Sequence, residues 1–149
     1  MTAPDSRPGV VTAACWLLVA GAVLLMTGGL LAATVGFDYL RQMQPPAVSD
    51  QSVRDLLWQY RGSGTLFCLA ALILLVFAIR ARRRDARSRR AAIAVGLVIV
   101  VLVSIVAGLQ IAGLHILSLF SLVPIIVGTL LLGRPAAAEW FNGRSDADV

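Results

Sequence analysis

The chain has 149 residues, of which 58% are hydrophobic and 14% charged, and its mean hydropathy is +0.84. These values lie outside the range of soluble domains, so we expect the lipid bilayer to be the solvent for most of the chain. The net charge of +5 comes from one short stretch, because the rest of the sequence sums to about zero. Such a local excess does not indicate a nucleic-acid-binding protein, and we expect no nucleic-acid partner.

The first uncharged segment, residues 10–36, predicts a membrane span. As a helix it would reach roughly 40 Å, which exceeds the roughly 30 Å thickness of the hydrocarbon core. The apolar part of a secretory signal peptide is shorter, about 7 to 15 residues. We therefore interpret this segment as an uncleaved span rather than as a signal peptide.

A polar segment, residues 37–62, follows, and its charges nearly balance. The proline pair 45–46 stops any continuing helix. Ser49 and either Asp50 or Ser52 then supply capping side chains for a new helix.

This new helix is expected to be short and amphipathic, because apolar residues recur in it at helical spacing. The stripe consists of Val53, Leu56, Leu57 and Tyr60. Two interpretations remain open: the helix lies on the membrane surface, or it packs only on the ends of the spans. Gly62 and Gly64 are expected to bend the backbone into the next span.

Three further spans are predicted, at residues 63–79, 92–111 and 116–132. Residues 91–133 carry no formal charge, and a single helix of that length would be about 65 Å long, so the run must fold back on itself. Pro124 is expected to bend the last span. The tail, residues 134–149, completes what we interpret as a single membrane domain.

Between the second and third spans lies a basic loop, residues 80–90, with seven arginines and one aspartate. Loops rich in arginine stay on the cytoplasmic side of a membrane. This rule places both termini and the tail in the cytoplasm and residues 37–62 outside, with ten arginines on the inner side and three on the outer. The chain is therefore predicted to be an all-α, four-span protein of the plasma membrane.

The basic loop is also the main candidate for a binding site, since clustered arginines attract anionic lipids at the inner leaflet. Its arginines are Arg80, Arg82, Arg83, Arg84, Arg87, Arg89 and Arg90.

Small residues recur at every fourth position in two spans and predict close helix packing. They are Gly28, Ala32 and Gly36 in the first span and Ser104, Gly108 and Ala112 in the third. The packing could lie inside this chain, within a homo-oligomer, or against a larger membrane protein.

No catalytic, cofactor or metal site is expected, and we do not interpret the chain as an enzyme. Cys15 and Cys68 lie near opposite ends of their spans, too far apart for a disulfide, so we expect both to be packed as small apolar side chains. His115 is the sole histidine, and a metal site needs about three or four ligands. With Gln110, it is expected to satisfy the turn or to meet lipid headgroups.

Three short motifs carry a resemblance to a family: residues 7–14, the arginine-rich loop leading into residues 91–93, and residues 133–135 followed by 139–141. With them, the layout resembles small, uncharacterised four-span integral membrane proteins of actinobacteria, although the aromatic residue often found in their arginine loop is missing. The resemblance implies the plasma membrane of a high-GC Gram-positive bacterium, and no activity.

The resulting hypothesis is an accessory or scaffolding component of a cell-envelope complex. The alternative is a small oligomeric transporter or exporter. Proton-coupled transporters need an ionisable group within the membrane, and the predicted spans contain no Asp, Glu, Lys or Arg.

Overall fold

The computed structural model describes residues 9–81, 86–108, 116–135 and 137. This part of the chain is helical, and four of its helices are long and apolar enough to cross a bilayer, which indicates a multi-pass membrane protein. The helices are α1 (Gly9–Ala33), α2 (Phe37–Met43), α3 (Asp50–Ala81), α4 (Ala86–Gly108) and α5 (Ile116–Gly133).

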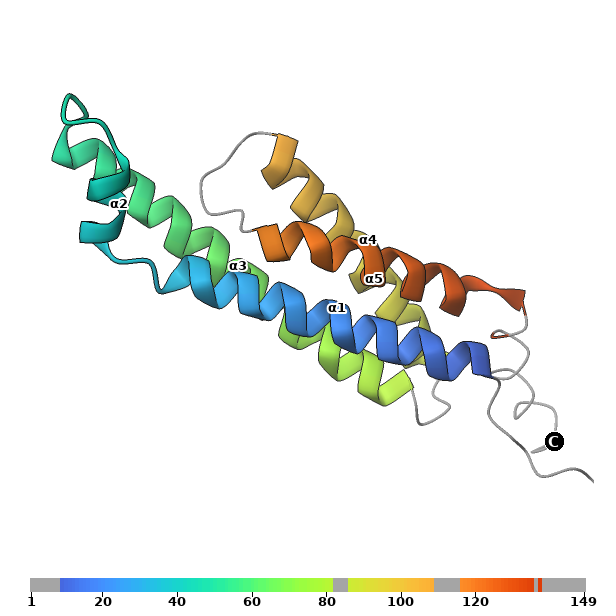
Figure 1. Ribbon diagram of the computed structural model, residues 1–149. Coiled ribbons are helices and arrows are strands. Elements are labelled where there is room, and N and C mark those ends of the chain that lie inside the picture. Colours follow the sequence, from blue (N-terminus) through green and yellow to red (C-terminus); the bar gives the residue numbers. More distant parts are fainter. Residues whose placement is uncertain (1–8, 82–85, 109–115, 136, 138–149) are drawn as a thin grey trace, which may run out of the picture.

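The four long helices form an antiparallel bundle (Figure 1). Helix α1 packs extensively against both α3 and α5, and α4 closes the bundle by packing less extensively against the same two helices. The first residue of α1 and the last of α5 lie at the same end, and α2 lies at the opposite end beside the start of α3 (Figure 1).

Helix α3 differs most from the sequence expectation. A short outer helix and a second span joined by a bend at Gly62 and Gly64 were expected, but residues 50–81 form one continuous helix. Its length is about 48 Å, so it exceeds the hydrocarbon thickness by several turns. Gly64 lies within this continuous helix, where its lack of a side chain allows close contact with α1.

The expected amphipathic stripe forms the first turns of this long helix. Val53 is buried, and Leu56, Leu57 and Tyr60 are half-buried. Helix α2 packs against α3, and its Leu40 is buried as well. The stripe is thus covered at least in part by protein, and its contact with a membrane surface stays a prediction.

The remaining boundaries differ by a few residues from those predicted. Helix α1 ends at Ala33 rather than residue 36, because Gly36 is already the extended residue that precedes α2. Helix α5 runs through Pro124 without interruption. Helix α4 begins at Ala86, so part of the predicted basic loop is helical.

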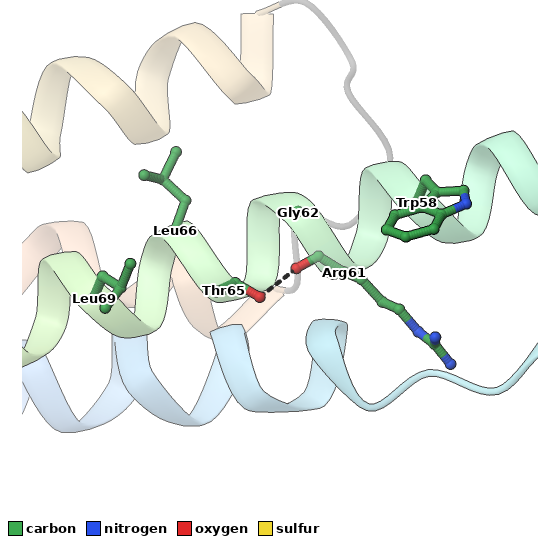
Figure 2. A pocket seen from close by; sticks show the side chains of 6 residues that line it. All are labelled: Trp58, Arg61, Gly62, Thr65, Leu66 and Leu69. Atoms are coloured by element: carbon green, nitrogen blue, oxygen red, sulfur yellow. Dashed lines mark hydrogen bonds between the residues drawn. The ribbon is translucent and has the colours of Figure 1, made fainter.

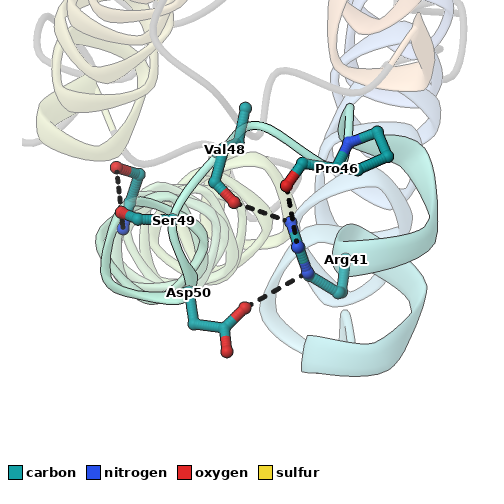
Figure 3. A network of polar contacts seen from close by, with 6 residues as sticks. Arg41, Pro46, Val48, Ser49 and Asp50 are labelled. Atoms are coloured by element: carbon teal, nitrogen blue, oxygen red, sulfur yellow. Dashed lines mark hydrogen bonds and ion pairs between the residues drawn. The ribbon is translucent and has the colours of Figure 1, made fainter.

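A network of polar contacts fixes the link between α2 and α3 (Figure 3). The Nε of Arg41 lies 3.2 Å from the Asp50 carboxylate, and its two Nη atoms donate to the carbonyls of Val48 (2.9 Å) and Pro46 (3.5 Å). Ser49 caps α3 as predicted, since its Oγ accepts the backbone N–H of Ser52 at 3.2 Å.

Candidate functional site

The end of the bundle farthest from α2 is basic. Arg80, Arg87 and Arg90 are exposed there on α3 and α4, and Arg134 follows α5. Three further arginines of the predicted lipid site, Arg82, Arg83 and Arg84, lie outside the described residues.

Arg89 has a structural contact in addition to its charge. It is half-buried, and its Nε donates a 2.9 Å hydrogen bond to the carbonyl of Leu132 in the last turn of α5. Cationic side chains at this position satisfy helix carbonyls that lack a partner in the helix. The hydrogen bond therefore links the start of α4 to the end of α5.

The opposite end carries both signs of charge. Three arginines and three aspartates lie in α2 and the first turns of α3, namely Asp38, Arg41, Asp50, Arg54, Asp55 and Arg61. The described residues thus have an unbalanced positive charge at one end only. This asymmetry is the feature that the positive-inside rule uses.

Two members of the first small-residue trio pack inside the bundle. Gly28 and Ala32 are buried, and a Cβ at Gly28 would lie 2.5 Å from the Oγ of Ser118 on α5. Gly36 lies outside α1, is exposed, and has open space at its Cβ position.

The second trio does not face the bundle. Ser104 and Gly108 are exposed on α4, and a Cβ at Gly108 would meet no atom of the described residues within 4 Å. Ala112 lies outside the described residues. The described part of this trio is therefore available to lipid or to another helix.

Most glycines that bring the helices together were missed by the sequence analysis. A Cβ at Gly64 would lie 2.5 Å from the backbone of Gly29 and Ala33, so α1 and α3 touch through their main chains there. Gly21 and Gly128 play the same part between α1 and α5.

A spacing of seven residues would have revealed this packing. Ala14, Gly21 and Gly28 repeat at that spacing along α1 and lie against α5. Cys15, Ala22 and Gly29 form a parallel repeat, and Gly29 faces α3. A period of seven is typical of left-handed helix packing, whereas the four-residue spacing that was considered is typical of right-handed pairs.

Neither cysteine has the surroundings of a reactive site. Cys15 is buried, and Cys68 is half-buried with its Sγ 3.7 Å from the carbonyl of Met26. Within the described residues, neither cysteine forms a disulfide. In the described residues no three His, Cys, Asp or Glu side chains come close enough to hold a metal ion, while His115 and Gln110 lie outside that part of the chain.

Several shallow grooves mark the outside of the bundle. One, of about 420 Å³, lies on α3 between Trp58 and Leu69. A second, about 280 Å³, lies between α1, α2 and α3 and is lined by Tyr39 and Tyr60, with Met43. A third, about 220 Å³ and lined wholly by aliphatic side chains, separates α3 from α4.

No protein-family model, curated protein or solved structure matches this chain. The geometry of the bundle, its charged ends and its exposed faces are therefore the features that bear on function.

Proposed function

We propose that this protein is an accessory or scaffolding component of a cell-envelope complex, and that the exposed face of α4 docks onto a larger membrane protein. The proposal is supported mainly by Ser104 and Gly108. Both are small, both are exposed, and they lie one helical turn apart. Small residues on a helix face allow a second helix to approach closely.

The rest of the molecule supports this assignment by contrast. Within α1, α3 and α5, the buried glycines already meet a neighbouring helix, as at Gly28 and Gly64. At Gly108, by contrast, no atom of the described residues lies within 4 Å of a Cβ position. Helix α4 also contacts its neighbours less extensively than α1 does, so one side of it is left for a partner.

The proposal includes a location and an orientation. The four spans lie in the plasma membrane, with both termini and the basic end in the cytoplasm and α2 outside. Exposed arginines on one end support this orientation, and there they would contact anionic lipids of the inner leaflet. The family resemblance of the sequence suggests an actinobacterial membrane.

A pull-down in mild detergent followed by mass spectrometry tests the scaffolding role. The unsubstituted chain should retain one larger membrane protein at fixed stoichiometry, and Ser104→Leu should lose most of it. The matched control is Thr27→Leu, because Thr27 is also an exposed hydroxyl residue within a span, on α1. Equal retention by both variants would refute docking through α4.

The alternative, a small oligomeric transporter, is favoured by one observation. Ser118 and Thr129 are buried on α5, and in the described residues their hydroxyls have no hydrogen-bond partner. Unpaired hydroxyls could line a polar path. They face α1 and α4 inside the bundle, however, where glycines lie against them. A homo-oligomer without a larger partner in the pull-down would favour the transporter.

A further inference from the structure

The groove on α3 has a chemical gradient along its length (Figure 2). Its volume is about 420 Å³, and it is open to the surroundings along the helix. The lining residues are Trp58, Arg61, Gly62, Thr65, Leu66 and Leu69. Since most of them are spaced three or four residues apart, they share one face of the helix.

Gly62 creates the hollow. A Cβ at this position would meet no atom within 4 Å, and the side chains on either side project well beyond the backbone. Trp58 is 75% exposed above it, and Leu66 and Leu69 are 45% and 54% exposed below it. Along the helix, the indole of Trp58 is therefore followed by the side-chain-free surface at Gly62 and then by the aliphatic side chains of Leu66 and Leu69.

Arg61 provides a positive charge at the Trp58 end of the groove, where its side chain projects away from Leu66 (Figure 2). Among the described residues, no side chain forms an ion pair or hydrogen bond with its guanidinium, in contrast to Arg41, which is held by Asp50. The Oγ1 of Thr65 donates to the backbone carbonyl of Arg61 at 2.7 Å. Asp55 lies outside the lining and accepts a hydrogen bond from Gln51. The lining thus carries a single positive charge.

The position of the groove fits the boundary between headgroups and hydrocarbon. Apart from Arg80 at the far end, the charged residues of α3 lie within residues 50–61, and the uncharged part of the helix begins at Gly62. From Arg61 to Leu69 the helix rises about 12 Å, which takes the groove from the polar interface into the acyl region. Tryptophan prefers this interface, because its apolar ring can lie against acyl chains while its N–H stays hydrated.

We propose that this groove binds one anionic phospholipid from the leaflet opposite the basic end of the bundle. The phosphate lies on the Arg61 guanidinium, and an acyl chain passes over Gly62 and along Leu66 and Leu69. Trp58 lies beside the headgroup. The inference is independent of the scaffolding role, because it concerns a different helix and needs no protein partner.

Quenching of Trp58 fluorescence by brominated phospholipids tests the proposal. The sequence has three tryptophans, so Trp16→Phe with Trp140→Phe leaves Trp58 as the sole reporter. The full chain is placed in phosphatidylcholine vesicles that contain a small fraction of brominated phosphatidylglycerol, brominated phosphatidylethanolamine or brominated phosphatidylcholine. We expect phosphatidylglycerol to bind about fivefold more tightly than either of the others.

Two variants locate the effect. Arg61→Gln should abolish the preference, whereas Arg54→Gln should preserve it, because Arg54 is an exposed arginine of the same helix outside the lining. Gly62→Leu should reduce quenching by all three lipids, because the added side chain fills the groove. Arg61 and Gly62 are exposed, so we expect both variants to keep the fold. Unchanged helicity in circular dichroism and an unchanged elution volume in size-exclusion chromatography would confirm this.

Three results would overturn the proposal. The first is equal quenching of Trp58 by all three lipids in the protein with Arg61 intact. The others are a preference for phosphatidylglycerol that persists in Arg61→Gln, or a preference that Arg54→Gln reduces as much as Arg61→Gln does. Weak quenching in every case would show that protein rather than lipid covers the groove, and would overturn it too. Replacing Arg80, Arg87 and Arg90 with glutamine should leave the Trp58 preference intact. That variant separates this site from lipid binding at the basic end.

Discussion

The interfaces of α1 and those of α4 are built differently. Helix α1 meets α3 and α5 through glycines, so that backbone lies against backbone, as where Gly29 faces Gly64. Helix α4 packs less extensively against the same neighbours, with Ile99, Val103 and Val106 among its buried side chains and a groove of about 220 Å³ beside α3. Lipid chains are as apolar as the helices, so packing quality rather than apolar burial sets helix association in a bilayer. The comparison indicates that α1 with α3 and α5 forms the most closely packed part of the bundle.

The sharpest test of this comparison is Gly64→Ala. The new methyl group would meet the backbones of Gly29 and Ala33, which cannot rotate away. We expect the free energy of unfolding, measured by titration with a denaturing detergent, to fall by about 2 to 3 kcal/mol.

Gly62→Ala is the control for this prediction, because it lies two residues away with open space at its Cβ position. It should leave the free energy of unfolding unchanged or raise it by up to about 1 kcal/mol, since alanine favours a helix. Equal losses in the two variants would contradict the assignment of Gly64 to a backbone contact.

A second test compares Gly21 on α1 with Gly96 on α4. A Cβ at Gly21 would lie 2.5 Å from Ile125 and 3.3 Å from the carbonyl of Ser121. At Gly96 the close contact is with the Oγ1 of Thr129, and the next atoms are 3.7 Å away or more. Gly21→Ala should therefore lower the free energy of unfolding by about 1 to 2 kcal/mol, and Gly96→Ala by less than about 0.5 kcal/mol.

A larger loss of unfolding free energy in Gly96→Ala than in Gly21→Ala would show that α4 packs at least as closely as α1. Combining Gly96→Ala with Thr129→Ala removes the hydroxyl that the new methyl group would meet. The pair should show a favourable coupling in a double-mutant cycle.

A third test concerns the contact that holds α4 to α5 at the basic end. Arg89→Gln removes the hydrogen bond to Leu132 and should lower the free energy of unfolding by about 1 kcal/mol. Arg90→Gln changes the charge equally at an exposed neighbour and should have little effect. If both variants lose the same amount, the effect comes from charge and not from the hydrogen bond.

The smallest effect is expected in the link between α2 and α3. The Arg41 and Asp50 side chains are 32% and 65% exposed, so their ion pair is worth at most about 0.5 to 1 kcal/mol. Arg41→Gln should leave the overall stability nearly unchanged but speed hydrogen exchange at the amide of Val48. Arg54→Gln should not speed this exchange, and if it did, the network around Arg41 would not be the cause.

The sequence by itself determined the class of protein and the approximate spans. Long uncharged segments such as residues 91–133 identify membrane spans, because a charged side chain is costly in hydrocarbon. A helix of about 20 residues crosses the hydrocarbon layer, so a segment of that length without charges is readily recognised. The cap of α3 at Ser49 was also predictable, since it depends on neighbouring residues alone. Orientation, lipid contact and partner remain predictions from the arrangement of the arginines and small residues.

Only the tertiary structure decided which small residues are contacts and which are open. In sequence, Gly62 and Gly64 are equivalent candidates for a bend. In the structure, Gly64 faces the backbone of α1, whereas Gly62 borders an open groove. Gly28 and Gly108 likewise belong to similar trios, and one is buried while the other is exposed. Glycine provides only the possibility of close approach, and whether a second helix takes that space depends on residues distant in the sequence.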